Sequence, residues 1–126
     1  LGIWINQHPM MGFDPGLDPN RGVTPVELIT GACLMMRRAE FDRVGGWDTG
    51  YLIGDYEDSD LCRSLARAGF SVAYLPEVEM THLERQSFGA VGKDTFRMKT
   101  TLANAARYAR RWQDALAALP GAEAAE

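Results

Sequence analysis

Long apolar runs, an excess of basic residues and cysteine clusters are all missing from this sequence. No stretch approaches the ~20 apolar residues of a membrane-spanning helix, and the first residues lack the basic-then-apolar order of a secretion signal. The formal net charge is -4, so no overall attraction to nucleic acid is expected. These absences favour a globular protein of the cytoplasm that has no nucleic-acid partner.

Cysteine is scarce, and its two copies do not have the spacing of metal ligands. Cys33 and Cys62 stand in apolar stretches, which is typical of small buried side chains in a reducing compartment. The sequence alone leaves a disulfide between them open. The chain has 126 residues, enough for one domain at most, and because it begins at Leu1 rather than Met we expect a piece of something longer.

Composition divides the chain into three segments. Residues 1–25 hold four of the six prolines and predict an irregular segment with at most a short strand over residues 2–5. Residues 26–92 alternate apolar runs with helix signals. Residues 93–126 predict a long helix and a small acidic tail.

The apolar patterns within these segments predict a mixture of strands and helices. Strands are expected over Val26–Met36, Phe70–Pro76 and Val78–His82. Helices are expected over Ala39–Val44, ended by Gly45 and Gly46, from Asp58 or Ser59 to Ala68, ended by Gly69, and over Asp94–Leu119. The inward faces would carry Leu61, Cys62, Leu65 and Ala66 on the middle helix and Phe96, Leu102, Ala106, Ala109, Trp112 and Leu116 on the last. The fold class is therefore α/β, with a small mixed sheet, flanking helices and a long C-terminal helix.

Carboxylates crowd the glycine-rich stretch between Gly46 and the middle helix. Acidic residues at a helix start cap free N–H groups and meet the positive end of the dipole, which accounts for Asp58 and Asp60. That explanation leaves Asp55 and Glu57 unexplained. A carboxylate at the mouth of a pocket can instead accept a proton from an attacking hydroxyl, and aromatic neighbours suit a sugar-like ligand. Both interpretations stay open on local spacing; the aromatic neighbours are Trp47, Tyr51 and Tyr56.

A resemblance to a known family joins these motifs. The order "TGACLMMRRAEFDRVGGWDTGY", followed by "YEDSDLCRSLARAGFSVAYLPEVEMTH", resembles the C-terminal half of the inverting glycosyltransferases of family 2, which have the GT-A fold of nucleotide-diphospho-sugar transferases. The matching motifs cover Ile29 to His82 in the expected order and spacing.

The resemblance implies a role for each matching residue. Asp58 would be the general base that deprotonates the acceptor hydroxyl, with Glu57 beside it. His82, which by itself is more often a structural histidine, would approach the metal, Mg or Mn, and the diphosphate. In the substrate-binding set, Gly31 and Ala32 would lie behind the donor sugar, and Trp47 and Asp48 would line the acceptor side. Tyr56 and Arg63 would complete the set. An alternative role for Arg63 is to fix the helix.

Two departures limit the resemblance. Thr49 stands where the family often has Glu, and no Asp-x-Asp metal motif or βαβ array precedes the "TGA" stretch. The chain would thus be a truncated domain, the acceptor and catalytic half of a split active site, and inactive alone. Its apolar surface around "VELITGACLMM" would favour a homodimer or aggregation.

The resemblance also implies the partners. They would be a nucleotide sugar and a glycan or lipid-linked acceptor, in polysaccharide biosynthesis for the cell envelope. The basic side chains of the last helix are expected to form a solvated face, with contact to the inner face of the plasma membrane as the alternative. They are Arg97, Lys99, Arg107, Arg110 and Arg111.

Two rival functions stay open. The half-domain could be a non-catalytic carbohydrate or protein interaction module. The acidic loop could equally be a structural cation site, which Ca would stabilise.

Overall fold

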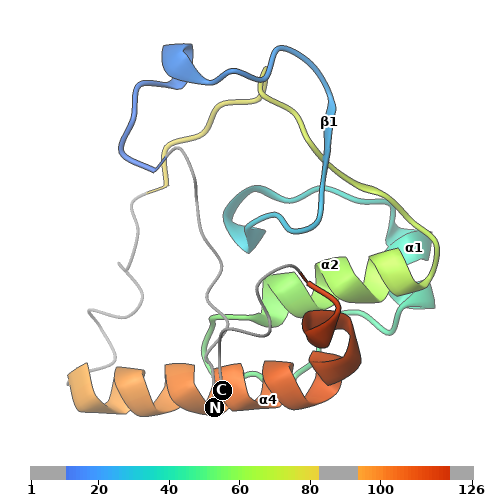
Figure 1. Ribbon diagram of the computed structural model, residues 1–126, viewed down its shortest axis with the longest axis vertical. Helices are drawn as coiled ribbons and strands as arrows, with labels where there is room; N and C mark the ends of the chain where they lie inside the picture. Colours follow the sequence, from blue (N-terminus) through green and yellow to red (C-terminus); the bar gives the residue numbers. More distant parts are fainter. Residues whose placement is uncertain (1–10, 83–93, 120–126) are drawn as a thin grey trace. The chain divides into compact units, whose positions relative to one another are not determined.

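The computed structural model describes residues 11–82 and 94–119, which are coloured in Figure 1. The chain falls into two compact units. The first, here called the motif unit, comprises Asn6–Asp48 and Glu57–Glu84. The second, the long-helix unit, comprises Leu1–Ile5, Thr49–Tyr56 and Arg85–Glu126. The strand expected over residues 2–5 and the acidic tail lie outside the described residues.

The motif unit contains a small antiparallel sheet. Strand β1 (Thr24–Val26) pairs with β2 (Val72–Tyr74), so that Val26 lies opposite Val72. Figure 1 shows β1 beside the chain that continues from helix α2. Among the described residues the sheet has two antiparallel strands, so the expected mixed sheet is wrong for this part of the chain.

The expected strand over Val26–Met36 is wrong beyond its first residue. The chain leaves β1 and forms a short 3-10 helix, η2 (Gly31–Cys33). The cause is local, because the Thr30 hydroxyl accepts a hydrogen bond from the Ala32 N–H and so caps a turn. Val78–His82 is also not a strand, since it has no partner strand among the described residues.

Two predicted helices of the motif unit are confirmed, beside a short 3-10 helix, η1 (Pro15–Leu17). Helix α1 (Arg38–Arg43) ends before Gly45 and Gly46, and α2 (Glu57–Arg67) before Gly69. These three glycines have φ of +88°, +70° and +87°, a region that other residues rarely adopt.

The inward face of α2 is confirmed with one exception. Leu61, Cys62 and Leu65 are buried, whereas Ala66 is exposed.

The long predicted helix is also confirmed. Helix α4 runs over Asp94–Ala117 and bends at Trp112, whose φ of -116° and ψ of 17° are not helical (Figure 1). Its buried residues recur at every fourth position, and the predicted inward Phe96, Leu102 and Ala106 are exposed. The buried set is Thr100, Asn104, Tyr108, Trp112 and Leu116, with Ala105.

Two smaller expectations meet the structure differently. The two cysteines are free; Cys62 is buried as expected, but Cys33 is exposed. The described helices and sheet confirm the α/β class. None of the described helices combines the length and the apolar character needed to cross a membrane.

A hydrogen-bonded pair joins the segment before β1 to β2. The Asp18 carboxylate is buried and accepts the Tyr74 hydroxyl at 2.6 Å and the Asn20 N–H at 2.9 Å. The Tyr74 hydroxyl is the main reason that the pKa of Asp18 is lowered, and the same bond raises the pKa of Tyr74. Folding is therefore coupled to both titrations.

We expect Tyr74→Phe to lower the melting temperature most at intermediate pH. The folded pKa of Asp18 lies below its ordinary 3.8, so this stabilisation is complete above that pH and is lost as the pH falls through the lowered value. The folded pKa of Tyr74 lies above its ordinary 10.0, so the stabilisation that depends on the protonated hydroxyl is lost as the pH rises through this raised pKa. Thermal melts over a pH series test this. In the Asp18→Asn background the same change should have little effect, and a pH-independent difference would contradict the assignment.

Candidate active site

The Asp58 carboxylate is held from both sides at the start of α2. Its Oδ2 accepts the Gly31 N–H at 2.9 Å. Its Oδ1 accepts two bonds from Ser59, one from the backbone N–H at 2.7 Å and one from the hydroxyl at 3.1 Å. The predicted base thus has a fixed orientation rather than a free rotamer.

Three predicted site residues from separate stretches of the motif unit meet here. A Cβ placed on Gly31 would lie 3.5 Å from Cβ of Asp58 and 4.0 Å from Cη2 of Trp47. Trp47 is 42% exposed, and its ring meets the Phe41 ring edge-on with centroids 6.0 Å apart. A carboxylate beside an accessible indole is a suitable surface for a sugar hydroxyl.

The remaining predicted residues of the motif unit are more dispersed. Ala32 is exposed, and Asp48 and Glu57 are half-buried. The Arg63 side chain is only 14% exposed and pairs with Glu27 at 3.9 Å, which suits its alternative role of fixing the helix. The substrate roles of these residues stay predictions.

The described residues contain no complete set of metal ligands. His82 is exposed, and nowhere in residues 11–82 and 94–119 do three His, Cys, Asp or Glu side chains gather in a way that could hold a metal ion. The residues present therefore do not fit a self-contained Mg or Mn site, and no chemical step is assigned to a metal here.

The long-helix unit contains a strained loop over Thr49–Tyr56. Ile53, Asp55 and Tyr56 have φ of 65°, 72° and 73°, in the left-handed region. Such a conformation costs about 1–3 kcal/mol for each residue other than glycine. The Gly54 N–H donates to the Leu52 carbonyl at 2.7 Å, which closes a three-residue turn around Ile53.

Asn104 of α4 holds this loop in place. Its side chain is 1% exposed, accepts the Leu52 N–H at 3.0 Å, and donates to the Leu52 carbonyl at 3.0 Å and the Gly54 carbonyl at 2.6 Å. The Thr101 hydroxyl adds a 2.6 Å bond to Asp55 Oδ2. The bonds from one buried amide thus offset the strain of the loop.

Two tyrosines anchor the same loop in the core of the long-helix unit. Tyr51 and Tyr56 are each 8% exposed, and the Tyr56 and Tyr108 rings have centroids 5.4 Å apart. Burial is the main cause that raises the pKa of Tyr56, and the Asp55 charge adds to it. The Arg107 guanidinium lies 5.6 Å from the centre of the Tyr51 ring, so this arginine covers the loop and does not belong to a purely solvated face.

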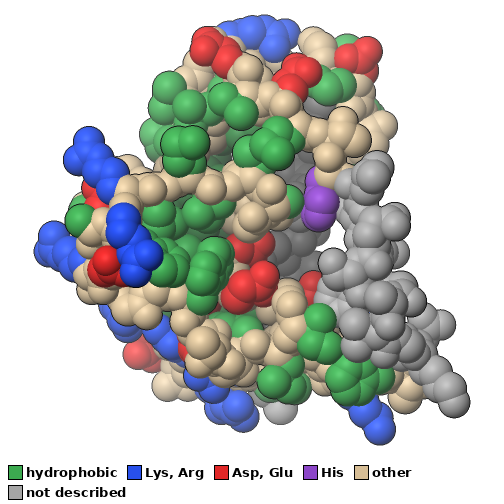
Figure 2. Space-filling model, turned by 180° about the vertical axis from the view of Figure 1, so that it is seen from behind, with side chains coloured by type: hydrophobic (Ala, Val, Ile, Leu, Met, Phe, Trp, Pro, Cys, Tyr) green, Lys and Arg blue, Asp and Glu red, His purple; other side chains and the backbone are tan. Residues whose placement is uncertain are grey.

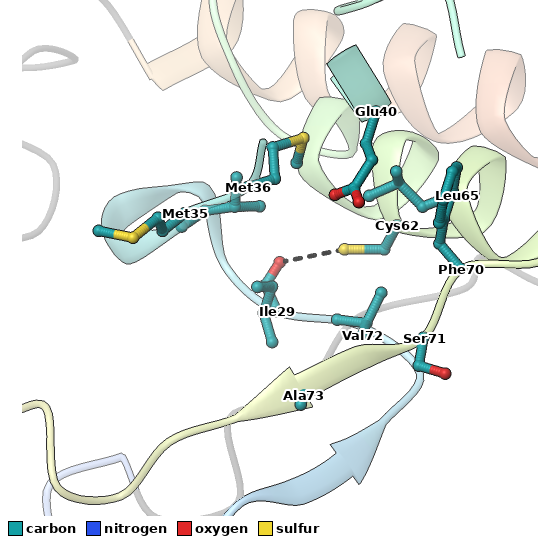
Figure 3. Close-up of a pocket in the computed structure, with 11 residues that line it drawn as sticks. Ile29, Met35, Met36, Glu40, Cys62, Leu65, Phe70, Ser71, Val72 and Ala73 are labelled. Atoms are coloured by element: carbon teal, nitrogen blue, oxygen red, sulfur yellow. Dashed lines mark hydrogen bonds between the residues drawn. The ribbon is translucent and has the colours of Figure 1, made fainter. Parts of the chain in front are cut away.

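A small open pocket of about 130 Å³, with polar and apolar lining, lies elsewhere in the motif unit (Figure 3). Cys62 and Phe70 are among its lining residues, and Figure 3 shows the Cys62 thiol pointing at the Ile29 carbonyl, 3.8 Å away. Burial raises the pKa of this thiol, so it stays protonated at neutral pH. Asp58, Gly31 and Trp47 are not part of the pocket lining.

Apolar side chains also stand at the surface. Figure 2 shows many of them, in green, on one face of the molecule. In the motif unit Met35 is 95% exposed, and Val23, Leu17 and Met80 exceed 60%. Exposed apolar area of this kind is typical of surfaces that associate.

Three residues have structural roles, in the motif unit or in the long-helix unit, that were not predicted from the sequence. Ser59 was expected only as a possible start of the middle helix and not as a partner of Asp58, and a capping analysis of the "TGA" stretch would have indicated Thr30. The signal for Asn104 is weaker: it is a polar residue in a series of buried positions that recur every four residues, which indicates a buried side chain that needs hydrogen-bond partners.

Comparison with known proteins identifies the family. A family model described as glycosyltransferase like family 2 matches residues 17–114. The chain therefore belongs to this glycosyltransferase-like family 2, and the resemblance in its motifs is confirmed.

Two relatives are rhamnosyltransferases by name. The chain is 40% identical over 65 residues to the N-acetylglucosaminyl-diphospho-decaprenol L-rhamnosyltransferase of Mycobacterium tuberculosis, a match that covers 52% of this chain and 21% of that protein. It is 32% identical over 85 residues to the rhamnosyltransferase WbbL of Escherichia coli K12, covering 63% of this chain and 32% of that protein. The chain thus matches less than a third of either relative's length. No solved structure matches it.

We expect Asn104→Ala to release the strained loop. The change leaves the Leu52 N–H and the Gly54 carbonyl without their partner, which lowers the free energy of unfolding by about 1–3 kcal/mol. Amide hydrogen exchange at Leu52 and Gly54 should accelerate, as measured by NMR or mass spectrometry.

A matched control separates this effect from general loosening of α4. Thr100→Val, one turn earlier, removes a bond of 3.0 Å from the Thr100 hydroxyl to the Phe96 carbonyl, within the helix. It should leave loop exchange slow. Equal loop exchange in the two variants would show that Asn104 does not hold the loop.

Proposed function

We propose that this chain is the acceptor-side part of an inverting glycosyltransferase of the GT-A fold, with Asp58 as its general base. Membership of the family supports the reaction class. The carrying observation is the Asp58 carboxylate, oriented by Gly31 and Ser59 beside the accessible Trp47 ring. An oriented carboxylate next to a sugar-binding surface is what deprotonation of an acceptor hydroxyl requires.

The proposed reaction is a single in-line displacement. Asp58 accepts the proton of the acceptor hydroxyl while the hydroxyl oxygen forms a bond to the anomeric carbon of the donor. The bond from that carbon to the diphosphate oxygen breaks, and the nucleoside diphosphate leaves with the bonding electrons. One displacement from the opposite face inverts the anomeric configuration. Trp47 and Asp48 would orient the acceptor, with Glu57 next to the base.

The substrates we propose are a nucleotide-activated sugar and a glycan or lipid-linked acceptor. The name of the mycobacterial relative, which includes a decaprenol-linked acceptor and a rhamnosyl group, supports these classes. They in turn suggest work at the cytoplasmic face of a membrane. His82 would approach the metal, Mg or Mn, and the remaining donor and metal ligands would come from residues other than the described ones.

We expect Asp58→Asn in the complete glycosyltransferase to lower kcat by roughly 10²–10⁴-fold, the usual contribution of a general base. Acceptor affinity should change little, because an amide of the same shape remains. The assay follows nucleoside diphosphate release from nucleotide-activated L-rhamnose with N-acetylglucosaminyl-diphospho-decaprenol as acceptor.

Asp42→Asn is the matched control. Asp42 is an exposed residue of α1 that pairs with Arg38 at 2.8 Å, and the same change of carboxylate to amide there should leave turnover intact. If the Asp58→Asn variant kept wild-type turnover, the assignment of Asp58 as the general base would be rejected. The rival function, a non-catalytic interaction module, would then be favoured.

We also expect the 126-residue chain by itself to show no transfer and no donor hydrolysis with common nucleotide sugars. A base alone supplies far less than the stabilisation of a leaving diphosphate contributes. Turnover assays with Mn present, together with light scattering, test this. Its exposed apolar side chains should make the chain self-associate, and robust activity from a monodisperse monomer would contradict the division of roles.

A further inference from the structure

We propose that the backbone N–H of Gly31 is a positioning group for the base, and that Oδ2 of Asp58 is the oxygen that receives the acceptor's proton. This inference rests on the proposed function, which names Asp58 as the base. It assigns to Gly31 a role different from the donor-sugar surface that the family resemblance implies.

The two oxygens of Asp58 are not equivalent. Oδ1 accepts two hydrogen bonds from Ser59, which is 1% exposed, and a carboxylate oxygen has about two acceptor sites. Oδ2 accepts one hydrogen bond from the described residues, that of Gly31, and retains an acceptor site. The bond from Gly31 to Oδ2 is exposed, whereas the two bonds to Oδ1 are partly buried. A proton from an acceptor hydroxyl can therefore reach Oδ2 and not Oδ1.

The direction of the Gly31 N–H is set by the turn that contains it. The first N–H groups of a helix have no partner within the helix. In η2, the Ala32 N–H donates to the Thr30 hydroxyl at 3.3 Å, while the Gly31 N–H donates to Asp58. Thr30 thus fixes the turn, and the backbone donor of Gly31, unlike a side chain, cannot rotate away from the carboxylate.

The space around Gly31 separates this role from a steric one. A Cβ there would lie 3.5 Å from Asp58 Cβ and 3.9 Å from Oδ2, which are ordinary contacts. Asp58 therefore tolerates a methyl group at this position but depends on the N–H. Alanine keeps that N–H, and proline removes it.

The test compares Gly31→Pro with Gly31→Ala in the complete glycosyltransferase. The backbone accepts proline here, because proline is favoured at the first residue of a helix and Thr30 already has the extended conformation, with φ of -73° and ψ of 142°, that precedes a proline. Its Cδ takes the place of the N–H hydrogen, however, so it also displaces Asp58 Oδ2, which lies 2.9 Å from the Gly31 nitrogen. We expect kcat of the proline variant to fall below that of the alanine variant by roughly 10- to 100-fold. The KM values for the donor should stay similar, whereas the melting temperature of the proline variant should be lower, because proline removes a hydrogen bond that alanine keeps.

A second pair of variants tests the support from Thr30. Thr30→Val removes the hydroxyl that caps η2 at nearly constant shape and should lower kcat. Thr30→Ser retains the hydroxyl and should restore it. Equal losses of kcat in valine and serine variants would overturn the part of the proposal that concerns Thr30.

Three outcomes would overturn the role of Gly31. One is equal kcat in the alanine and proline variants. Another is a donor KM that rises equally in both, which would show that the residue backs the donor sugar. The third is a Gly31 amide proton resonance in the 126-residue chain that does not respond to Asp58→Asn, since the hydrogen bond would then be absent.

The resonance also keeps the two proposals apart. A shifted Gly31 resonance together with wild-type turnover in Asp58→Asn would reject the base, and the positioning role with it, while the hydrogen bond itself stands. An unshifted resonance together with lost turnover in Asp58→Asn would keep the base and reject only Gly31.

Discussion

The motif unit depends on one carboxylate, that of Asp58, which is hydrogen-bonded to the first residues of two helices. Asp58 accepts hydrogen bonds from N–H groups at the beginning of α2 and at the beginning of η2, so its charge meets the positive end of the α2 dipole and a backbone N–H of the η2 turn. The bond to Gly31 spans 27 residues of sequence and fixes the turn after β1 against α2. The acidic start of α2 is therefore both a helix cap and a tertiary anchor, and the two explanations open at the level of sequence are compatible.

The long-helix unit is organised by an opposite kind of constraint, a strained segment kept in place by a buried amide. Ile53 has a β-branched side chain, which makes its positive φ costly, and Asn104 supplies the bonds that maintain it. Strained backbone of this kind is concentrated at functional sites. The loop ends at Tyr56, one residue before the Glu57 and Asp58 pair, so the strain and the proposed base are neighbours in the chain.

Local signals predicted the helices well and the sheet poorly. Gly45, Gly46 and Gly69 marked helix ends because only glycine adopts their φ easily. The run "VELITGACLMM" has a strand's composition, but strands need partners, and the Thr30 cap competes with pairing. Family motifs indicated Gly31, Trp47 and Asp58, and the structure brings them together. Asn104 escaped notice because its role depends on a loop about fifty residues earlier, which helical periodicity does not report.

The most direct test of the account is a crystal structure of the complete glycosyltransferase with an acceptor bound. We predict that the reactive hydroxyl of the acceptor lies about 2.6–3.2 Å from Asp58 Oδ2, the reach of a general base, with the Gly31 N–H still bonded to that oxygen. A hydroxyl bound to another carboxylate, with Asp58 turned away from Gly31, would contradict it.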